Sequence, residues 1–222
     1  YCAAADMTDA AEIIATARAL LLDFDGPITA LMPPPLNARA AERARAALQH
    51  VSLPGEIRTT TDHLAVLRYA AEHQDTELGS VEAACSAAEI DCARISQPSP
   101  EVHAILCGAT RRSVPVAVVR NNSEEAVKEF LHRFGWTESI RVLSCRTPSI
   151  ALKLKPNPFL VEKAVALLGV DAADCVFVGD SVTDVEAGNA AGVRVVGLAK
   201  TAERGRQLIG AGAWAAIERE YW

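Results

Sequence analysis

The sequence of 222 residues lacks several features that would mark particular classes of protein. It has no excess of basic residues: the formal net charge of −6 argues against nucleic acid or an anionic membrane surface as the main partner. No apolar run approaches the roughly 20 residues that a membrane-spanning helix needs. The six cysteines form no Cys-x-x-Cys pair and no Cys/His metal cluster. We therefore expect reduced thiols in a cytoplasmic protein.

Internal repeats, low-complexity tracts and an obvious flexible linker are also missing. The length suggests one domain, or a domain that carries a sizeable insertion, and the 50% hydrophobic content is ample for a packed core. Residues 1–14 lack the basic-then-apolar order of a secretory signal. We hypothesise that Met7 is the natural start, which a mass spectrum of the native protein would test.

Short apolar runs alternate with amphipathic segments from residue 114 onward. We expect strands at 19–24, 114–119, 141–145, 175–178, 193–198 and 213–216, and helices near 124–134, 158–168, 183–191 and 201–209. Gly135, Gly169 and Gly192 follow three of these helices, where a C-cap favours glycine. The alternation predicts an α/β fold: a doubly wound, mostly parallel, Rossmann-like sheet covered on both faces.

Residues 31–110 break this alternation. They are rich in alanine, carry no clear β-branched run, and predict helices near 36–50, 62–74, 78–93 and 99–110. Because this block lies between the first and second strands, we expect an inserted all-helical cap domain at 31–110. The core domain is then formed by residues 1–30 and 111–222. An ordinary extension of the core is the alternative.

Two acids end the first expected strand. In "ALLLDFDGPIT", three leucines lead directly into Asp23 and Asp25, although burying an unpaired carboxylate is costly. Residues i and i+2 of a strand point to the same side, and the carboxyl ends of strands in open α/β sheets line the ligand crevice. A bare Asp-x-Asp is a weak signal, since it also occurs in turns. Its place after an apolar strand favours a functional site.

A second acidic pair lies in "VFVGDSVTDVEAG". Asp180 ends an apolar strand, and Asp184 lies at the start of the following helix. The simple alternative is structural: Asp180 or Ser181 caps the helix, and Asp184 complements its dipole. That alternative explains one acid well and two acids less well.

If both strand ends lie in one parallel sheet, four carboxylates meet. Like charges about 4 Å apart repel by roughly 4 kcal/mol per pair at an effective dielectric constant of 20. Such a cluster needs a cation, and hard oxygen ligands around an open position favour Mg²⁺. We therefore predict a magnesium site.

A lysine lies between the two acidic pairs in "LKLKPNPF". Lys155 precedes Pro156, which favours an extended backbone just before a helix. An ammonium group fixed there could hold an anionic substrate or steady a carboxylate nucleophile. Lys153 is the local competitor, and as an isolated residue either lysine would be solvated.

Taken in order, these motifs resemble those of the haloacid dehalogenase superfamily, in its subclass with a helical cap. The matching stretches are "DFDG" at 23–26, "VAVVRNNS" at 116–123, "KPNP" at 155–158 and "GDSVTD" at 179–184. The resemblance runs from about residue 18 to residue 215. Each motif alone is modest, but their order, their spacing and their placement at strand ends are specific.

The resemblance implies a role for each acid and for the lysine. Asp23 would be the nucleophile that forms an aspartyl-phosphate, and Asp25 the general acid that later activates water. Asp180 would share a Mg²⁺ ion with Asp23 and the main-chain carbonyl of Asp25, with Asp184 as the supporting acid. Lys155 would balance the charge of nucleophile and phosphoryl group. An acid at position 25 favours phosphoester cleavage over dehalogenation, because a halide leaves without a proton.

One position departs from the family pattern. The second strand of relatives usually ends in Ser or Thr, which donates a hydrogen bond to the phosphoryl group, whereas the alignment places Arg120 there, followed by Asn121. We expect both residues to contact substrate, Arg120 by a forked contact to phosphate. Arg120 could equally fill the pocket, or pair with Asp23 and weaken its attack. A slipped alignment would use Ser123 instead, although Ser123 more naturally caps the next helix.

The function expected from these observations is that of a Mg²⁺-dependent phosphatase acting on a small phosphorylated metabolite, as a monomer or homodimer. A phosphomutase shares every motif and is the nearest alternative. A catalytically weak relative that binds a phosphorylated ligand or a protein is a second alternative, which Arg120 keeps open. A receiver-like signalling domain fits the cap and the Asp23–Asp25 pair poorly.

Overall fold

A computed structural model of the chain describes residues 10–100 and 102–218. The N-terminal hypothesis about Met7, and Cys2, lie outside these ranges. The strands are β1 (Ala19–Leu22), β2 (Val116–Ser123), β3 (Val142–Arg146), β4 (Cys175–Gly179), β5 (Arg194–Ala199) and β6 (Ala215–Glu218). The helices are α2 (Leu36–Ala46), α3 (Gly55–Thr59), α4 (His63–His73), α5 (Asp75–Ala93), α6 (Val102–Arg111), α7 (Glu124–Arg133), α8 (Phe159–Leu168), α9 (Val182–Ala190) and α10 (Ala202–Gly210). Short 3₁₀ helices lie at η1 (Thr137–Ser139), η2 (Pro148–Lys153) and η3 (Ala172–Asp174).

The six strands form one sheet in the order β3-β2-β1-β4-β5-β6, and every neighbouring pair is parallel. This arrangement confirms the predicted α/β fold. The order reverses direction between β1 and β4, with Leu20 opposite Val176 and Leu22 opposite Val178. A doubly wound sheet binds ligands at such a reversal, outside the carboxyl ends of its strands.

Both faces of the sheet are buried, as the continuous apolar runs predicted. Leu21 packs into one apolar cluster, with Phe177 and side chains of α8 and α9, while Leu20 and Leu22 pack into a second cluster with α7. Phe24 and Phe130 meet edge to face in the second cluster, with ring centroids 5.1 Å apart. Covering helices on both sides therefore hold β1 rigidly, and its carboxyl end is a fixed platform.

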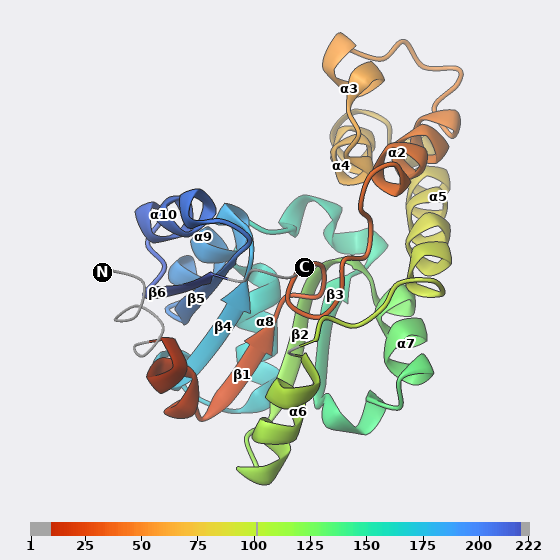
Figure 1. Ribbon diagram of the computed structural model, residues 1–222. Helices are drawn as coiled ribbons and strands as arrows, with labels where there is room; N and C mark the ends of the chain where they lie inside the picture. Colours follow the sequence, from red (N-terminus) through yellow and green to blue (C-terminus); the bar gives the residue numbers. More distant parts are fainter. Residues whose placement is uncertain (1–9, 101, 219–222) are drawn as a thin grey trace.

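Helices α2 to α5 pack on one another and form what we term the helical block, which is inserted between β1 and β2. In Figure 1 the block lies beyond the arrowheads of the strands, while α6 lies toward the opposite end of the sheet. The buried residues of α6, such as Leu106, belong to the same apolar cluster as Leu20. The division into a cap at 31–110 and a core remains a prediction.

Most elements lie within a few residues of their predicted positions. The helix α3 was not predicted, because its five residues lie in a stretch with Pro54 and Gly55 that is typical of a loop. The prediction of glycine at helix ends is confirmed: Gly169 is the C-cap of α8, and Gly135 and Gly192 directly follow the C-cap residues of α7 and α9. The φ angles of Gly135, Gly169 and Gly192 are 67°, 68° and 73°. Among the described residues, no helix is both long and apolar enough to cross a membrane.

Candidate active site

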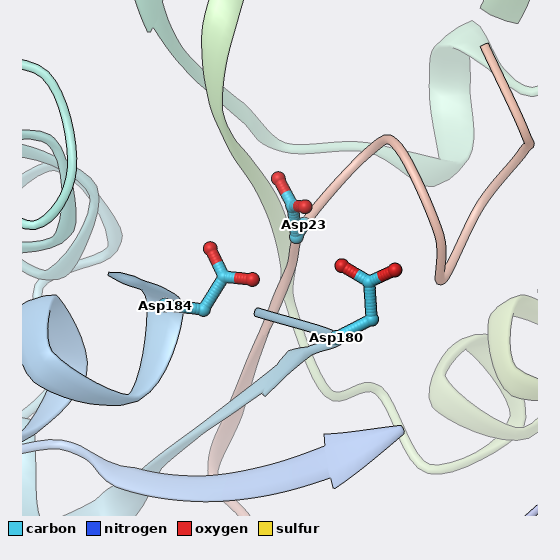
Figure 2. Close-up of side chains that lie close together, drawn as sticks. All are labelled: Asp23, Asp180 and Asp184. Atoms are coloured by element: carbon cyan, nitrogen blue, oxygen red, sulfur yellow. The ribbon is translucent and has the colours of Figure 1, made fainter. Parts of the chain in front are cut away.

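Three carboxylates meet at the reversal of strand order. Asp23 directly follows β1, Asp180 directly follows β4, and Asp184 lies in the first turn of α9. Figure 2 shows that the three side chains lie close together. One carboxylate oxygen of each lies within 4.8 Å of the others. The pairing of the parallel strands β1 and β4 thus brings Asp23 and Asp180 together, although they are more than 150 residues apart in sequence.

Gly26 allows the loop after β1 to approach Asp180. Its φ of +118° is a conformation that residues with a side chain rarely adopt, and a Cβ atom there would lie 2.3 Å from Asp180 Oδ2. Both the backbone shape and the space therefore require glycine after Asp25.

Lys155 lies among the carboxylates and is itself buried, with a side-chain exposure of 2%. Its Nζ donates to Asp23 Oδ1 at 2.7 Å, to Asp184 Oδ1 at 2.5 Å and to the main-chain oxygen of Val119 at 3.2 Å. The competitor Lys153 is exposed and lies over the ring of Phe159, 4.8 Å from its centroid. Of the two lysines, the structure places only Lys155 beside the acids.

The guanidinium group of Arg120 contacts both acids of the first motif, Asp23 and Asp25. Its Nη1 lies 3.2 Å from Asp23 Oδ2, and its Nη2 lies 3.2 Å from Asp25 Oδ2. Its Nε donates to Asn122 Oδ1. The other oxygen of Asp25 accepts from the main-chain N–H of Leu31 at 2.9 Å, so the carboxylate of Asp25 is held at both ends.

The family model for haloacid dehalogenase-like hydrolases matches residues 17–192 of the chain. The chain belongs to this family. The finding confirms the predicted resemblance and the expected hydrolase class.

Phosphatases are among the curated relatives of this hydrolase. A phosphoglycolate phosphatase of Xylella fastidiosa is 28% identical over 79% of this chain and 77% of its own length. An N-acetylmuramic acid 6-phosphate phosphatase of Pseudomonas aeruginosa is 29% identical, but over 48% of this chain and 46% of its own length. The alignments therefore span between about half and three quarters of these relatives.

Solved structures share the fold of this family member at lower identity. CbbY from Rhodobacter sphaeroides, solved in complex with phosphate, has a TM-score of 0.70 and 21% identity, covering 90% of this chain and 93% of its own. A putative beta-phosphoglucomutase from Thermotoga maritima has a TM-score of 0.62 and 21% identity, covering 90% and 94%.

The structural interpretation of the second acidic motif is confirmed at Ser181, while the role of Asp180 and Asp184 in a metal site remains a prediction. Ser181 is the N-cap of α9 and forms a capping box with Asp184, whose Oδ2 accepts from the Ser181 main chain at 3.0 Å. The other oxygen of Asp184 faces Lys155. One carboxylate thus caps the helix and contributes to the acidic cluster.

Arg204 of α10, which the sequence did not single out, donates Nε and Nη2 to the main-chain oxygen of Asp180.

The polar residues after Arg120 lie close to the site without pointing at the acids. The amide of Asn121 accepts from the Lys155 main-chain N–H at 2.8 Å and donates to the Lys155 carbonyl at 3.2 Å, so it fixes the lysine backbone. Its contact with substrate remains a prediction. Ser123 occupies the N-cap position of α7, but its side chain makes no capping hydrogen bond.

The donor set fits a divalent cation. Three carboxylate oxygens converge, which suits the preference of Mg²⁺ for hard oxygen ligands. Within the described ranges, Lys155 and Arg120 form ion pairs with this group of acids, and a divalent ion would add positive charge where the carboxylate oxygens converge. Asp23, Asp180 and Asp184 would hold the ion. The carboxylate of Asp25 is not among these three, and a contribution from its main-chain carbonyl remains a prediction.

The surroundings of the acids shift the pKa values of Asp23 and Asp180 in opposite directions. Burial alone would raise the pKa of Asp23, but Lys155 and Arg120 outweigh it and lower the pKa below its usual value. Burial and the nearby carboxylates, Asp23 first among them, raise the pKa of Asp180 to about 7. The acid at position 23 is therefore kept ionised, as a nucleophile must be.

The raised pKa of Asp180 predicts a pH-dependent stability of the metal-free protein. The folded state binds the Asp180 proton more tightly than the unfolded state, so stability is lost as pH rises from the unfolded pKa of 3.8 through about 7. Asp180→Asn removes this loss. In EDTA, we expect the variant to melt several degrees above the parent at about pH 8, with a much smaller gap at about pH 5. An equal gap at both pH values, measured by thermal unfolding, would contradict this assignment.

Proposed function

We propose that this hydrolase is a Mg²⁺-dependent phosphatase that acts on a small phosphomonoester through an aspartyl-phosphate at Asp23. The observation that carries the proposal is the pairing of Asp23 and Asp25 through one guanidinium group at the ligand-binding edge of the sheet. Asp23 is 2% exposed and held ionised, while the side chain of Asp25 is 30% exposed beside it. One acid is thus built to attack and the other to exchange protons with substrate or water.

In the first step, an oxygen of Asp23 attacks phosphorus and the bond to the leaving oxygen breaks. Asp25 gives its proton to that oxygen and becomes a carboxylate. In the second step, Asp25 takes a proton from water, whose oxygen attacks phosphorus and releases phosphate and the Asp23 carboxylate. Lys155 and Arg120 oppose the negative charge on Asp23 and on the transferring oxygens. A bound Mg²⁺ ion would add charge neutralisation at the same oxygens.

The two named phosphatase relatives support phosphomonoesters of small metabolites as the substrate class. The first assay is hydrolysis of p-nitrophenyl phosphate with Mg²⁺, with and without EDTA. We expect turnover that EDTA abolishes and excess Mg²⁺ restores. Full activity in EDTA would contradict the metal dependence, and no turnover of any phosphoester would contradict the proposed function. A phosphomutase would instead isomerise a sugar phosphate with little release of phosphate.

Arg120 is proposed to bind the phosphoryl oxygens, exchanging its contact with Asp23 for one with substrate. Its guanidinium lies 3.2 Å from the nucleophile, where the phosphoryl group must arrive. A hydrogen bond to a charged group contributes about 1.5–3 kcal/mol, so Arg120→Ser should lower kcat/KM roughly tenfold to a hundredfold, mainly through KM.

The exposed Arg206 provides the matched control, because Arg206→Ser removes an arginine that, within the described part of the chain, pairs with Glu203 at the surface. That variant should retain the parent kinetics. A rise in turnover of Arg120→Ser would contradict the proposal and indicate that Arg120 restrains Asp23.

A further inference from the structure

A buried polar network joins the helical block to the sheet beside the acidic cluster. Its centre is Glu89 of α5, which is fully buried. Four partners surround the carboxylate of Glu89: the main-chain N–H of Ser123 at 2.8 Å, Asn122 Nδ2 at 2.7 Å, His63 Nε2 at 2.8 Å and Arg146 Nη1 at 2.8 Å. These partners come from β2, α4 and β3, so a single side chain links three elements.

Glu89 is ionised in this setting. Burial alone would raise its pKa, but Arg146 and His63 outweigh burial and hold the pKa well below its usual value. A buried carboxylate is stable only when its charge is paired and its oxygens accept hydrogen bonds. As a carboxylate, Glu89 can only accept hydrogen bonds, and it therefore dictates which groups may face it.

The ionised Glu89 determines the orientation of the side-chain amide of Asn122. This side chain is fully buried, and its Nδ2 must face Glu89 because Glu89 accepts but cannot donate. The amide oxygen then points the other way, where it accepts from Nε of Arg120. If the amide were reversed, its NH₂ group would face a guanidinium that only donates. Glu89 thus fixes the orientation of Asn122.

Asn122 in turn fixes the fork of Arg120. With Nε engaged, the guanidinium presents Nη1 to Asp23 and Nη2 to Asp25. Arg120 and Asn122 are two residues apart on β2, where the register of β2 against β3 shifts between Arg120 and Ser123. A sequence of contacts therefore runs from α5 through Asn122 to both acids of the first motif.

We propose that Glu89 and Asn122 are positioning residues that aim the Arg120 guanidinium at the site of phosphoryl transfer. Through Glu89 and Asn122, the position of α5 against the sheet determines the orientation of the Arg120 guanidinium group. This inference rests on the proposed function where it concerns catalysis, but the aim of Arg120 can be measured without turnover. A network that only fastened α5 to the sheet would affect stability and leave Arg120 unchanged.

Asn122→Ala is the decisive variant, because it removes the link and leaves Glu89 with His63 and Arg146. The matched control is Ser123→Ala: the Ser123 hydroxyl is buried and has no hydrogen-bond partner within the described part of the chain, and its main-chain N–H would still reach Glu89. Glu89→Gln deprives Arg146 of a counter-charge and should lower Tm. Its matched control is Glu82→Gln, since Glu82 pairs with Arg146 Nε but no contact between Glu82 and Asn122 is found in the described ranges.

The first readout is the Nε–H signal of Arg120 in ¹⁵N NMR spectra, assigned by its loss in Arg120→Ser. We expect Asn122→Ala and Glu89→Gln to shift this signal, and Ser123→Ala and Glu82→Gln to leave it in place. An unmoved signal in Asn122→Ala would overturn the proposal. The NMR signal can be measured whether or not the protein hydrolyses p-nitrophenyl phosphate. Failure of the positioning proposal can therefore be told apart from failure of the proposed function.

The second readout is a double-mutant cycle with p-nitrophenyl phosphate. Asn122→Ala should raise KM roughly tenfold, by analogy with loss of one charged hydrogen bond, with a smaller effect on kcat. In the Arg120→Ser background, the same substitution should have no further effect, because Asn122 acts only through Arg120. An equal loss in both backgrounds would contradict a positioning role.

Discussion

Asp23→Asn is expected to abolish hydrolysis of p-nitrophenyl phosphate, with a loss in kcat of more than roughly 10³-fold. The amide cannot attack phosphorus as the ionised carboxylate does, and it also removes one of the three oxygens that converge for a cation. Folding should persist, since Lys155 keeps its contact with Asp184. Steady-state kinetics and circular dichroism of the same sample measure both effects.

The control for this loss is Asp174→Asn, which makes the same chemical change at a surface residue paired with Arg18. It should retain the parent rate. Residual turnover of Asp23→Asn near the parent level, in a sample free of parent enzyme, would exclude Asp23 as the nucleophile.

Asp25→Asn is expected to separate the two chemical steps. p-Nitrophenolate is a good leaving group that needs no proton, so phosphorylation of Asp23 should continue. Hydrolysis of the aspartyl-phosphate needs a base to take a proton from water, and its loss should slow that step roughly 10²- to 10⁴-fold. Stopped-flow absorbance should show a burst of p-nitrophenolate of about one equivalent per enzyme, followed by a slow steady rate.

An alkyl phosphate should behave differently with the same variant. Its leaving oxygen needs the proton from Asp25, so both steps should be slow and no burst of alcohol should form. A steady rate of p-nitrophenyl phosphate hydrolysis equal to that of the parent would contradict the role of Asp25. A burst from the parent protein alone would place the slow step elsewhere.

The sheet could be predicted because its signals are local. Apolar runs such as 175–178 are bounded by turn residues, and Gly169 marks a helix end through backbone sterics alone. The convergence of Asp23 with Asp180 also followed from the sequence, since parallel strands share one carboxyl edge. In a parallel sheet, motifs that follow different strands therefore lie at the same edge.

The partners of Arg120 could not be predicted, because a local pattern does not say which of several acids a long side chain will reach. The sequence left open whether Arg120 faces phosphate, fills the pocket or pairs with Asp23. The structure pairs it with Asp23 and Asp25 together. Glu89 was missed for a related reason: on an Ala-rich helix it resembles an ordinary solvated acid. Its burial depends on Arg146, which is distant in sequence.

The central claim is that Asp23 carries the phosphoryl group. Borohydride reduces an acyl phosphate to an alcohol, so treating Asp25→Asn during turnover of p-nitrophenyl phosphate should convert residue 23 to homoserine. Peptide mass spectrometry would locate the change, with substrate-free protein as the control. We predict homoserine at position 23 only when substrate is present. A burst of p-nitrophenolate with position 23 unmodified, or with another residue reduced, would contradict the account.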